Sequence, residues 1–472
     1  MTRLSLNELP RLPEAVAVPA YDPASVQTGI VHFGPGAFFR AHQAAYVDAL
    51  LAKDPRWGIC GVSLHSAGVR DALEAQNGLY TLAILDEEIS YRVIGSLREV
   101  LVAPEDREAV FQRLTKPSVR IVTSTVTEKG YCLGADFTLD FAHPDIVHDV
   151  QNPAAPKSFI GYVVEGLRRR HQNGQSPFVL IACDNLPSNG HRLKAAVVAL
   201  AGRQDKALAD WIAAELVCPC TMVDSITPAT DNALRARVAE MIGHDDAWPI
   251  QREAFTQWVI EAHPHEDGPD WASVGVTLTD NVPAFERAKL RLLNGPHSTL
   301  AYVGSLKGFE TVAEAMQDEE LAGFVRALML DDIAPLLEAP AGLDLPAYCE
   351  AILKRFRNPA IRHLLAQIAW DGSQKLPIRI LSSLSEALEQ GRDISRLCVP
   401  LAAWMRFVRG KAVTGGDLTD PLAETLLAVG RACDDSAADA ARFLALREVF
   451  PEGLARTPAF ADGVAKAYAA LI

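Results

Sequence analysis

The hydrophobic and polar positions follow different patterns in the two parts of the chain. Between about residues 27 and 225, short apolar runs rich in β-branched residues alternate with stretches of helical periodicity. Strands that alternate with helices predict a parallel, doubly wound sheet covered by helices. The predicted strands are residues 29–33, 58–64, 91–94, 119–125, 178–183 and 221–223, and the predicted helices are residues 38–51, 107–114, 160–170 and 192–201.

After about residue 281, the pattern changes to amphipathic helices separated by Gly, Pro or Asn-Pro signals. The segments are residues 284–293, 312–329, 345–357, 359–370, 377–389, 395–408, 421–432 and 437–449, and none reads convincingly as a strand. The predicted fold class is therefore α/β. A Rossmann-like doubly wound domain is expected over residues 1–280, and an all-α domain over residues 281–472, with the boundary near 280–283.

Composition narrows the class of protein. A chain of 472 residues is too long for one ordinary core, and its 22% charged and 49% hydrophobic residues are typical of a globular protein. A net charge of −14 argues against a nucleic-acid partner. No apolar run approaches the roughly 18 residues of a membrane span, and no secretory signal is visible, so the expected location is cytoplasmic. The eight scattered cysteines predict reduced, mostly buried thiols.

The first candidate site is a glycine turn. An apolar strand ending at Phe33 continues into Gly34-Pro-Gly36 and then a helix, where glycines let the backbone approach a pyrophosphate. The GxGxxG fingerprint is incomplete, and an ordinary glycine-rich turn is the alternative. No carboxylate ends the second strand, and His65 and Arg70 could instead face a 2′-phosphate. The choice between NAD and NADP therefore stays open.

The second candidate surrounds Lys289. At about 100° per residue, Glu286, His297 and Asn294 lie about 60°, 80° and 140° from Lys289, on one half of a helix. Alcohol oxidation needs a base for the hydroxyl proton and donors for the resulting alkoxide, which a neutral lysine and an asparagine amide can supply. Gly295-Pro296 is expected to kink or end this helix. A structural ion pair between Glu286 and Lys289 is the alternative.

Two further polar segments are candidates. An apolar strand delivers Asp184 and Asn185 at its C-terminal end, where α/β sheets place ligands, although an Asx turn capping the next helix would explain Asn189-Gly190. The segment 371–379 reads as a polar loop whose cations, Lys375 and Arg379, could bind a hydroxyl-rich or carboxylate substrate. A surface loop is the alternative.

Metal binding is not expected. His263-Pro-His265-Glu-Asp267 contains metal-ligating residue types, but a proline-containing loop without helical spacing is a poor site. Cys218 and Cys220 form a CxC pair without a second cysteine pair or a histidine at zinc-finger spacing.

Several motifs together give the chain a family resemblance. They are GxGxFxRxH at 34–42, TVTEKGYC at 125–132, CDNLPxNG at 183–190, MVDxITP at 222–228, FxQWVIE at 255–261, KxxxxNGxH at 289–297 and DGSQKLPxR at 371–379. The chain resembles, over nearly its whole length, the mannitol dehydrogenase family of polyol-specific long-chain dehydrogenases, which also contains the fructuronate reductases.

The resemblance implies residue roles for a two-domain enzyme with its site between the domains. Lys289 would be the general base, Asn185 and Asn294 the oxyanion donors, His297 would position the substrate and Glu286 would assist proton release. Asp224, with Lys375 and Arg379, would bind substrate. The cofactor, NAD with NADP as the alternative, would lie at Gly34, Gly36, Phe38 and Arg40, and no metal would be required.

The implied function is the interconversion of a secondary alcohol and a ketone, with a mannitol/fructose-type polyol preferred and D-mannonate/D-fructuronate oxidoreduction as the alternative. The chain departs from the family pattern at Ser225 (usually Arg), at Pro296 (usually small), at Gln367 (Arg in mannitol 2-dehydrogenases) and after Glu261. The acidic pair that reads the adenosine ribose in mannitol 2-dehydrogenases falls on Ala67 and Gly68. These departures keep a third interpretation, a non-catalytic NAD(P)-binding sensor. A monomer or weak homo-oligomer is expected.

Overall fold

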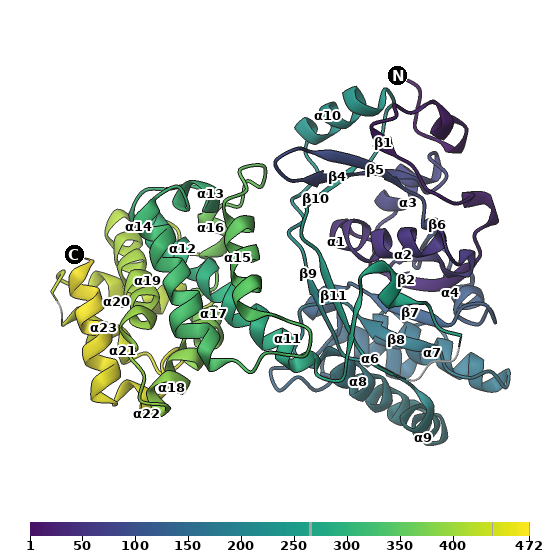
Figure 1. Ribbon diagram of the computed structural model, residues 1–472. Helices are drawn as coiled ribbons and strands as arrows, with labels where there is room; N and C mark the ends of the chain where they lie inside the picture. The colour runs from purple at the N-terminus through teal and green to yellow at the C-terminus, as the bar shows by residue number, and fades with distance from the viewer. Residues whose placement is uncertain (264–266, 437, 472) are drawn as a thin grey trace. The chain divides into compact units, whose positions relative to one another are not determined.

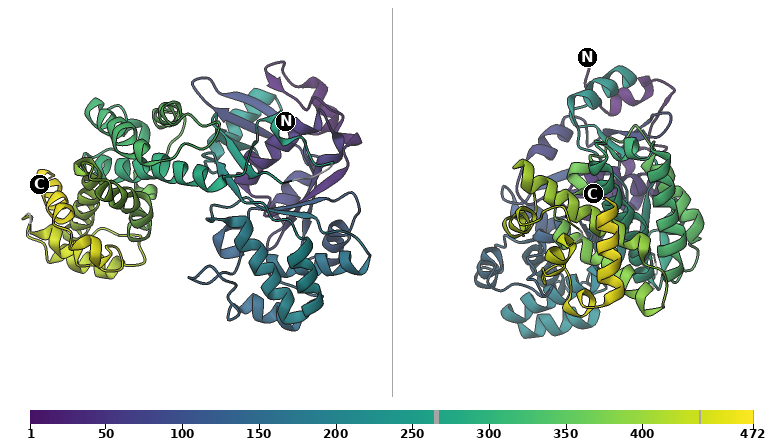
Figure 2. Two further views of the ribbon diagram at one scale, coloured as in Figure 1. Left: turned by 60° about the horizontal axis from the view of Figure 1, so that its bottom comes forward. Right: turned by 90° about the vertical axis from the view of Figure 1, so that its left-hand side faces the viewer.

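The computed structural model describes residues 1–263, 267–436 and 438–471. It divides into two compact units, unit 1 (residues 1–283) and unit 2 (residues 284–472), which Figure 1 shows as the purple-to-teal and green-to-yellow parts of the chain. The strands lie in unit 1. The two further views in Figure 2 show that unit 2 consists of helices. The predicted fold class, a Rossmann-like domain followed by a helical domain, is confirmed.

The central sheet of unit 1 is parallel and has five strands in the order β6-β3-β2-β7-β8. From β2 the chain builds outward through β3 and β6, and then returns to β2 to add β7 and β8. The order therefore reverses between β2 and β7, which is where doubly wound sheets bind ligands outside their strand ends. The strands are β2 (Thr28–Phe33), β3 (Gly58–Ser63), β6 (Leu97–Val102), β7 (Ile121–Ser124) and β8 (Val179–Ala182).

Both faces of this sheet are buried. On β2, Val31 and Phe33 belong to the core shared with α7 (Phe159–Gln172) and α8 (Asn189–Gln204), whereas Ile30 belongs to the core shared with α2 (Gln43–Leu51). Successive residues of a strand point to opposite faces, so an apolar run without alternation is what a sheet covered on both faces requires. The other helices of this unit are α1 (Ala37–Ala41), α3 (Gly68–Glu74), α4 (Arg107–Leu114), α5 (Thr127–Gly130), α6 (Pro144–Gln151), α9 (Lys206–Glu215) and α10 (Asn232–Ile242).

Two predicted strands lie outside the parallel sheet. The strand predicted at 91–94 is β5 (Ser90–Ile94), which pairs in a sheet of order β1-β5-β4-β10. The strand predicted at 221–223 is β9 (Thr221–Asp224), which pairs antiparallel with β11 in the order β12-β11-β9. A local apolar pattern identifies a strand but not its partner, and the unpredicted strands that pair here are β1 (Val16–Ala17), β4 (Tyr80–Leu85), β10 (Ile250–Glu253), β11 (Gln257–Glu261) and β12 (Thr277–Thr279).

Unit 2 contains no strand in the part that is described, apart from a single bridge between Thr311 and Leu364. Its elements are α11 (Val282–Ala288, which begins in unit 1), the π-helix η5 (Lys289–Asn294), α12 (Gly295–Leu306), α13 (Val312–Ala315), α14 (Glu319–Ala327), the π-helix η6 (Leu328–Ile333), α15 (Leu345–Phe356), α16 (Leu365–Ile368), α17 (Gly372–Leu376), the π-helix η8 (Pro377–Leu381), α18 (Ser382–Glu389), α19 (Ser395–Thr414), α20 (Ala423–Arg431), α21 (Asp439–Leu444), α22 (Glu452–Ala455) and α23 (Pro458–Ala470). No helix of the described chain has the length and apolarity to cross a bilayer.

The segment predicted as a polar loop at 371–379 is helical. One of its polar residues, Ser373, is held by a distant carboxylate, because its backbone N–H and its Oγ both donate to Asp420, the Oγ at 2.5 Å. Asp371 precedes α17 with a left-handed φ of 55°, and Gly372 has no room for a side chain beside Trp404. The loop prediction was wrong because these tertiary contacts compensate for the weak local helical signal.

Candidate active site

The glycine turn lies at the point where the strand order reverses. Gly34 follows β2 with φ +87°, and a Cβ there would lie 2.2 Å from the backbone oxygen of Thr125 after β7. Only glycine therefore permits this backbone and its approach to the next strand. The Thr125 hydroxyl donates to the Gly34 carbonyl at 2.7 Å, and Gly36 is exposed. The turn presents open backbone beside the ends of β2 and β7, which fits a pyrophosphate.

His32, within β2, supports this turn from below. The side chain is buried, with Nδ1 2.7 Å from the Thr123 hydroxyl and Nε2 3.0 Å from the Thr125 hydroxyl, and its ring stacks on Phe39 at 3.5 Å. Burial lowers the pKa of His32 to about 3, so the ring is neutral near pH 7. The sequence prediction did not include His32. The signal that could have identified it is a single polar residue within an apolar strand.

Arg40 and Phe38 were both expected to contact the cofactor, and they differ in exposure. Arg40 is fully buried, donates to the Trp248 carbonyl at 3.1 Å and lies 4.8 Å from the Trp248 ring. Burial lowers its pKa to about 10, which leaves it charged near pH 7. A fully buried side chain does not fit the expected contact between Arg40 and a cofactor. Arg40 instead packs α1 against Trp248, which lies just before β10. Phe38 is half-buried and stacks on His42 at 5.0 Å.

The end of β3, where the adenosine ribose would lie, carries a neutralised cation. Arg70 pairs with both Asp71 and Glu105, and these partners raise the pKa of its guanidinium. His65 is exposed. A guanidinium already shared by two carboxylates is a poor receptor for a 2′-phosphate, so the possibility that Arg70 reads NADP loses its physical basis.

Asp184 holds the loops at the ends of β7 and β8 together. Its carboxylate accepts from the backbone N–H groups of Val126 and Thr127, both at 3.0 Å, and from the Tyr131 hydroxyl at 2.6 Å. Burial raises the pKa of Asp184, against the opposing effect of these hydrogen bonds. Asn185, the next residue, is exposed at the same end of β8. The frame formed by Asp184 therefore positions Asn185.

Asn189 is not the Asx cap that the sequence suggested. Its amide donates to the carbonyls of Ala182 and Thr221, and its oxygen accepts from the Thr221 N–H at 2.9 Å, so it joins β8 to β9. Asp224 is buried at the end of β9. Ser225, at the position where arginine is usual, donates to the Phe255 carbonyl at 3.1 Å. The hydrogen bonds from Asn189 to Thr221 hold the start of β9 in place, and Asp224 lies at the end of the same strand.

In unit 2, Lys289 begins a π-helical segment inside one continuous helix. The backbone stays helical through Asn294 and Gly295 into α12, so the helix does not end at Gly295-Pro296, where a kink or an end was expected. A π-helix makes i→i+5 bonds and has about 4.4 residues per turn. By that geometry Asn294 lies about 50° from Lys289 rather than about 140°, and His297 about 10° away. The π-helix therefore gathers both side chains on the face of Lys289.

Gly295 and Pro296 fit this course of the chain. A Cβ at Gly295 would lie 3.1 Å from the Arg379 carbonyl, so glycine lets the helix approach η8 closely. Pro296 lies where η5 passes into α12, and the chain stays helical on both sides of it. This departure from the family pattern leaves the helix intact.

His297 lies in a cationic surrounding with an unsatisfied nitrogen. It is buried, its ring contacts Phe356 at 4.5 Å and His363 at 4.9 Å, and its Nε2 has no hydrogen-bond partner among the described residues. Burial, followed by His363, Arg355 and Arg379, holds the pKa of His297 well below its usual range. A neutral imidazole with an unused nitrogen is suited to bind a substrate hydroxyl.

Lys375 and Arg379 lie one helical turn apart and are both half-buried. The Lys375 Nζ donates only weakly, to the Ile368 carbonyl at 3.4 Å, and Arg379 donates to the Ser298 hydroxyl at 3.1 Å. Burial and then Arg379 lower the pKa of Lys375, and burial lowers the pKa of Arg379. Across the described chain, neither lies within ion-pair distance of a carboxylate. These cations are arranged to meet an anion or hydroxyl groups.

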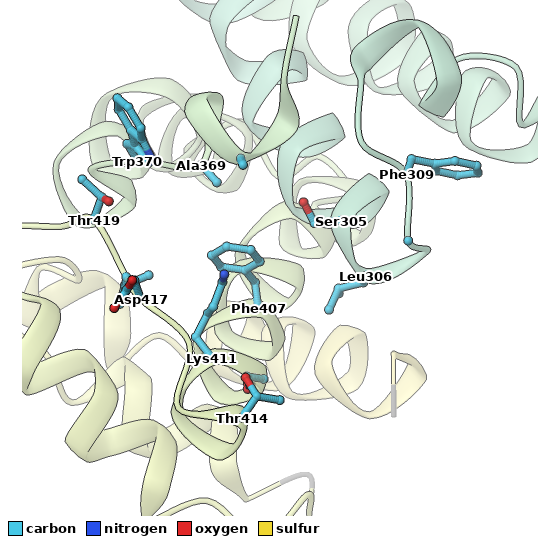
Figure 3. A pocket seen from close by; sticks show the side chains of 14 residues that line it. Ser305, Leu306, Phe309, Ala369, Trp370, Phe407, Lys411, Thr414, Asp417 and Thr419 are labelled. Atoms are coloured by element: carbon cyan, nitrogen blue, oxygen red, sulfur yellow. The ribbon is translucent and has the colours of Figure 1, made fainter.

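A separate pocket of about 520 Å³ opens in unit 2 (Figure 3). Figure 3 shows Phe407 and Lys411 on one wall and Trp370 with Asp417 on another. Its lining includes none of Lys289, Asn294, His297, Lys375 and Arg379. The pocket is therefore distinct from the candidate site residues.

Comparisons with known proteins agree with both units. Residues 28–273 match the family described as mannitol dehydrogenase Rossmann domain, and residues 281–472 match the mannitol dehydrogenase C-terminal domain. D-mannonate oxidoreductase of Escherichia coli is 40% identical over 99% of this chain and 97% of the relative. Mannitol 2-dehydrogenase of Phaeosphaeria nodorum is 39% identical over 90% of this chain and 77% of the relative.

A solved structure is similar over the whole chain. The Pseudomonas fluorescens mannitol 2-dehydrogenase, in a ternary complex with NAD and D-mannitol, is 37% identical, has a TM-score of 0.83, and is matched over 100% of this chain and 97% of its own. The similarity in structure therefore covers the glycine turn of unit 1 as well as the helices of unit 2.

Proposed function

The chain belongs to the mannitol dehydrogenase family and is an oxidoreductase, and on that premise we propose that it is an NAD-dependent hexonate dehydrogenase with Lys289 as its general base. The reaction is the interconversion of a secondary alcohol and a ketone on a small polyhydroxylated acid. The observation that carries the choice of an acid is the half-buried pair Lys375 and Arg379, which has no carboxylate partner in the described chain.

The proposed mechanism divides the work between a base and two amides. Lys289, in its neutral form, takes the proton of the substrate hydroxyl. Asn185 and Asn294 donate to the oxygen as its negative charge develops, and Glu286 assists release of the proton. The turn at Gly34 and Gly36 would hold the dinucleotide, whose nicotinamide supplies a hydride acceptor when bound. This division requires no zinc.

Substrate recognition is proposed to lie in unit 2. His297 offers its unpartnered Nε2 to a hydroxyl group. Lys375 and Arg379 receive the carboxylate, because removing two cations from water is costly unless an anion compensates them. Asp224, which belongs to unit 1, binds further hydroxyl groups of the substrate. NAD is favoured over NADP because Arg70 is occupied by Asp71 and Glu105.

A neutral polyol such as mannitol is the second candidate. It is supported by the similarity to proteins named mannitol 2-dehydrogenase, one of which was solved with D-mannitol bound. Cations can also donate hydrogen bonds to hydroxyl groups, so Lys375 and Arg379 accommodate this substrate as well, without compensation of their charge.

The test is a turnover screen with NAD and NADP across D-mannonate, D-mannitol and their ketone counterparts. We expect kcat/KM for the hexonate with NAD to exceed that for the polyol by at least about a hundredfold, because a site built for a polar group rejects analogues that lack it. Equal or better turnover of the polyol would establish the second candidate. Binding of NAD, measured by titration, without turnover of any substrate would support the sensor interpretation.

A further inference from the structure

A cluster of metal-ligating side chains lies in unit 1, outside the residues assigned to the reaction. His191, Cys220 and Glu261 each offer one nitrogen, sulfur or oxygen atom, and these atoms all lie within 4.8 Å of one another. Cys220 is buried, Glu261 is partly buried and His191 is exposed, so the cluster can be reached from solvent. The cluster was not visible in the sequence, because its members are 29 and 41 residues apart.

The sheet fixes two of these side chains on one face. Glu261 of β11 is directly opposite Cys220 at the start of β9, because the antiparallel register pairs Ile260 with Thr221. The Glu261 N–H donates to the Cys220 carbonyl at 2.8 Å. Side chains of directly opposed residues point to the same face, with Cβ atoms about 5 Å apart. The Glu261 Oε2 accepts from the Cys220 N–H at 2.8 Å, which orients the carboxylate and leaves its other oxygen for an ion.

The third side chain is brought in by close packing of a helix. His191 is in the first turn of α8, and a Cβ at its neighbour Gly190 would lie 2.4 Å from the Cys218 carbonyl. Only glycine lets the helix press so closely on the chain that enters β9. Asn189 bonds to both the N–H and the carbonyl of Thr221. The position of His191 beside Cys220 is therefore set by the fold and not by one flexible side chain.

We propose that His191, Cys220 and Glu261 bind a divalent transition metal, with Zn²⁺ as the best match to one thiolate, one imidazole and one carboxylate. In a tetrahedral zinc site the ligand atoms lie about 3.5 Å apart, so small side-chain rotations bring these atoms, now within 4.8 Å of one another, to coordinating positions. Water completes the coordination.

The metal joins three elements of unit 1. It would connect the start of α8 to β9 and β11. Both α8 and β9 lead to proposed site residues, because α8 begins four residues after Asn185 and β9 ends at Asp224. Cys220 immediately precedes β9 and Asp224 ends it, about 13 Å away in an extended chain. The ion is thus a structural one, separate from the proton transfer assigned to Lys289.

The test uses the full-length protein, stripped with a chelator and then titrated with Co²⁺ alone. We expect one equivalent of Co²⁺ to bind with a thiolate-to-metal charge-transfer band and the intense visible bands of tetrahedral cobalt, and Zn²⁺ to displace it. His191→Asn and Cys220→Ser should each weaken binding by about a hundredfold or more, above the usual cost of losing an outer-shell partner. Zn²⁺ should raise the Tm of the parent by several degrees and leave that of His191→Asn unchanged.

The matched control is His171→Asn, which removes another exposed imidazole from unit 1 and should leave Co²⁺ binding unchanged. Because His191 is exposed, its variant should fold normally, and circular dichroism checks this. Cobalt bound without the charge-transfer band, or bound equally by the parent, His191→Asn and Cys220→Ser, would overturn the proposal. A loss of turnover that follows metal removal at temperatures where the protein stays folded would overturn the structural role.

Discussion

Two polar residues that support the ends of the strands in unit 1 and three candidate substrate-binding residues in unit 2 have opposite surroundings. In unit 1, Asp184 accepts three hydrogen bonds and His32 contacts two threonine hydroxyls, so neighbouring residues of the same unit satisfy both side chains. In unit 2, Lys375 and Arg379 are half-buried with no carboxylate partner in the described chain, and the Nε2 of His297 has no partner there.

The difference separates support from recognition. A buried polar group with a complete set of partners stabilises the fold, and little is left over for a ligand. A buried polar group without partners is costly to the isolated protein, and a substrate that supplies the missing partner recovers this cost. On this reasoning we expect unit 1 mainly to position the cofactor turn and Asn185, with Asp224 as its substrate contact, and unit 2 to recognise the substrate.

The largest expected effect is on the proposed base. Lys289→Met should lower kcat by about a thousandfold, because a positioned acid–base group contributes about 10²–10⁴ in rate. Binding of NAD, measured by titration, should be unchanged. Lys307→Met is the matched control, because Lys307 ends the same helix but pairs with Asp318. A Lys289→Met enzyme with nearly full kcat would remove Lys289 from the chemistry.

The next effect concerns the π-helix. Asn294→Ala should lower kcat by about a hundredfold with KM little changed, since a lost oxyanion donor costs mainly transition-state stabilisation. The readout is the split between kcat and KM on the preferred substrate. If KM rises while kcat is retained, Asn294 contributes to binding alone, and the alignment with Lys289 in the π-helix has no catalytic purpose.

In unit 1 the expected effect is on stability instead. Asp184→Asn should lower the free energy of unfolding by about 2 kcal/mol, because an amide cannot accept all the bonds of a carboxylate and places an N–H against backbone donors. Urea denaturation measures this change, and any fall in kcat should follow from a displaced Asn185, because the frame formed by Asp184 positions that residue. A large loss of kcat with unchanged stability would make Asp184 part of the chemistry.

The effect that is smallest per pH unit is a pH dependence from His32. Its pKa is lowered from 6.5 to about 3 by burial, so below pH 6.5 the unfolded chain binds a proton that the folded chain does not. This contribution is complete above pH 6.5 and is lost as the pH falls towards 3, by about 1.4 kcal/mol per pH unit. His32→Asn should remove that part of the slope of unfolding free energy against pH. An unchanged slope would contradict the burial argument.

The sequence predicted the fold class because apolar periodicity and glycine turns are local signals. It could not predict that β5 and β9 leave the parallel sheet, since their partners lie in distant segments. It also could not predict the π-helix at Lys289–Asn294, because residues of an ordinary helical pattern do not distinguish i→i+5 from i→i+4 hydrogen bonds. The loop predicted at 371–379 became helical for the same kind of reason, a bond from Ser373 to distant Asp420.

Single polar residues were harder to interpret than motifs. Arg40 and Asn189 stand in recognisable motifs, yet one is buried against Trp248 and the other joins β8 to β9. His363 and Arg355, which flank His297, carry no local signal that separates them from ordinary helix residues. A motif identifies where a site lies, whereas the partners of each side chain decide what it does there.

The most direct test of this account compares kcat/KM for a hexonate and a polyol in the parent enzyme and in Arg379→Gln. The account predicts that the parent prefers the hexonate and that the variant loses at least about tenfold of this preference, through a higher KM for the acid alone. Arg291→Gln, whose arginine already pairs with Glu386 in the same unit, should keep the parent's ratio. An equal loss on both substrates in Arg379→Gln would contradict the claim that the unpaired cations of unit 2 read the substrate's charge.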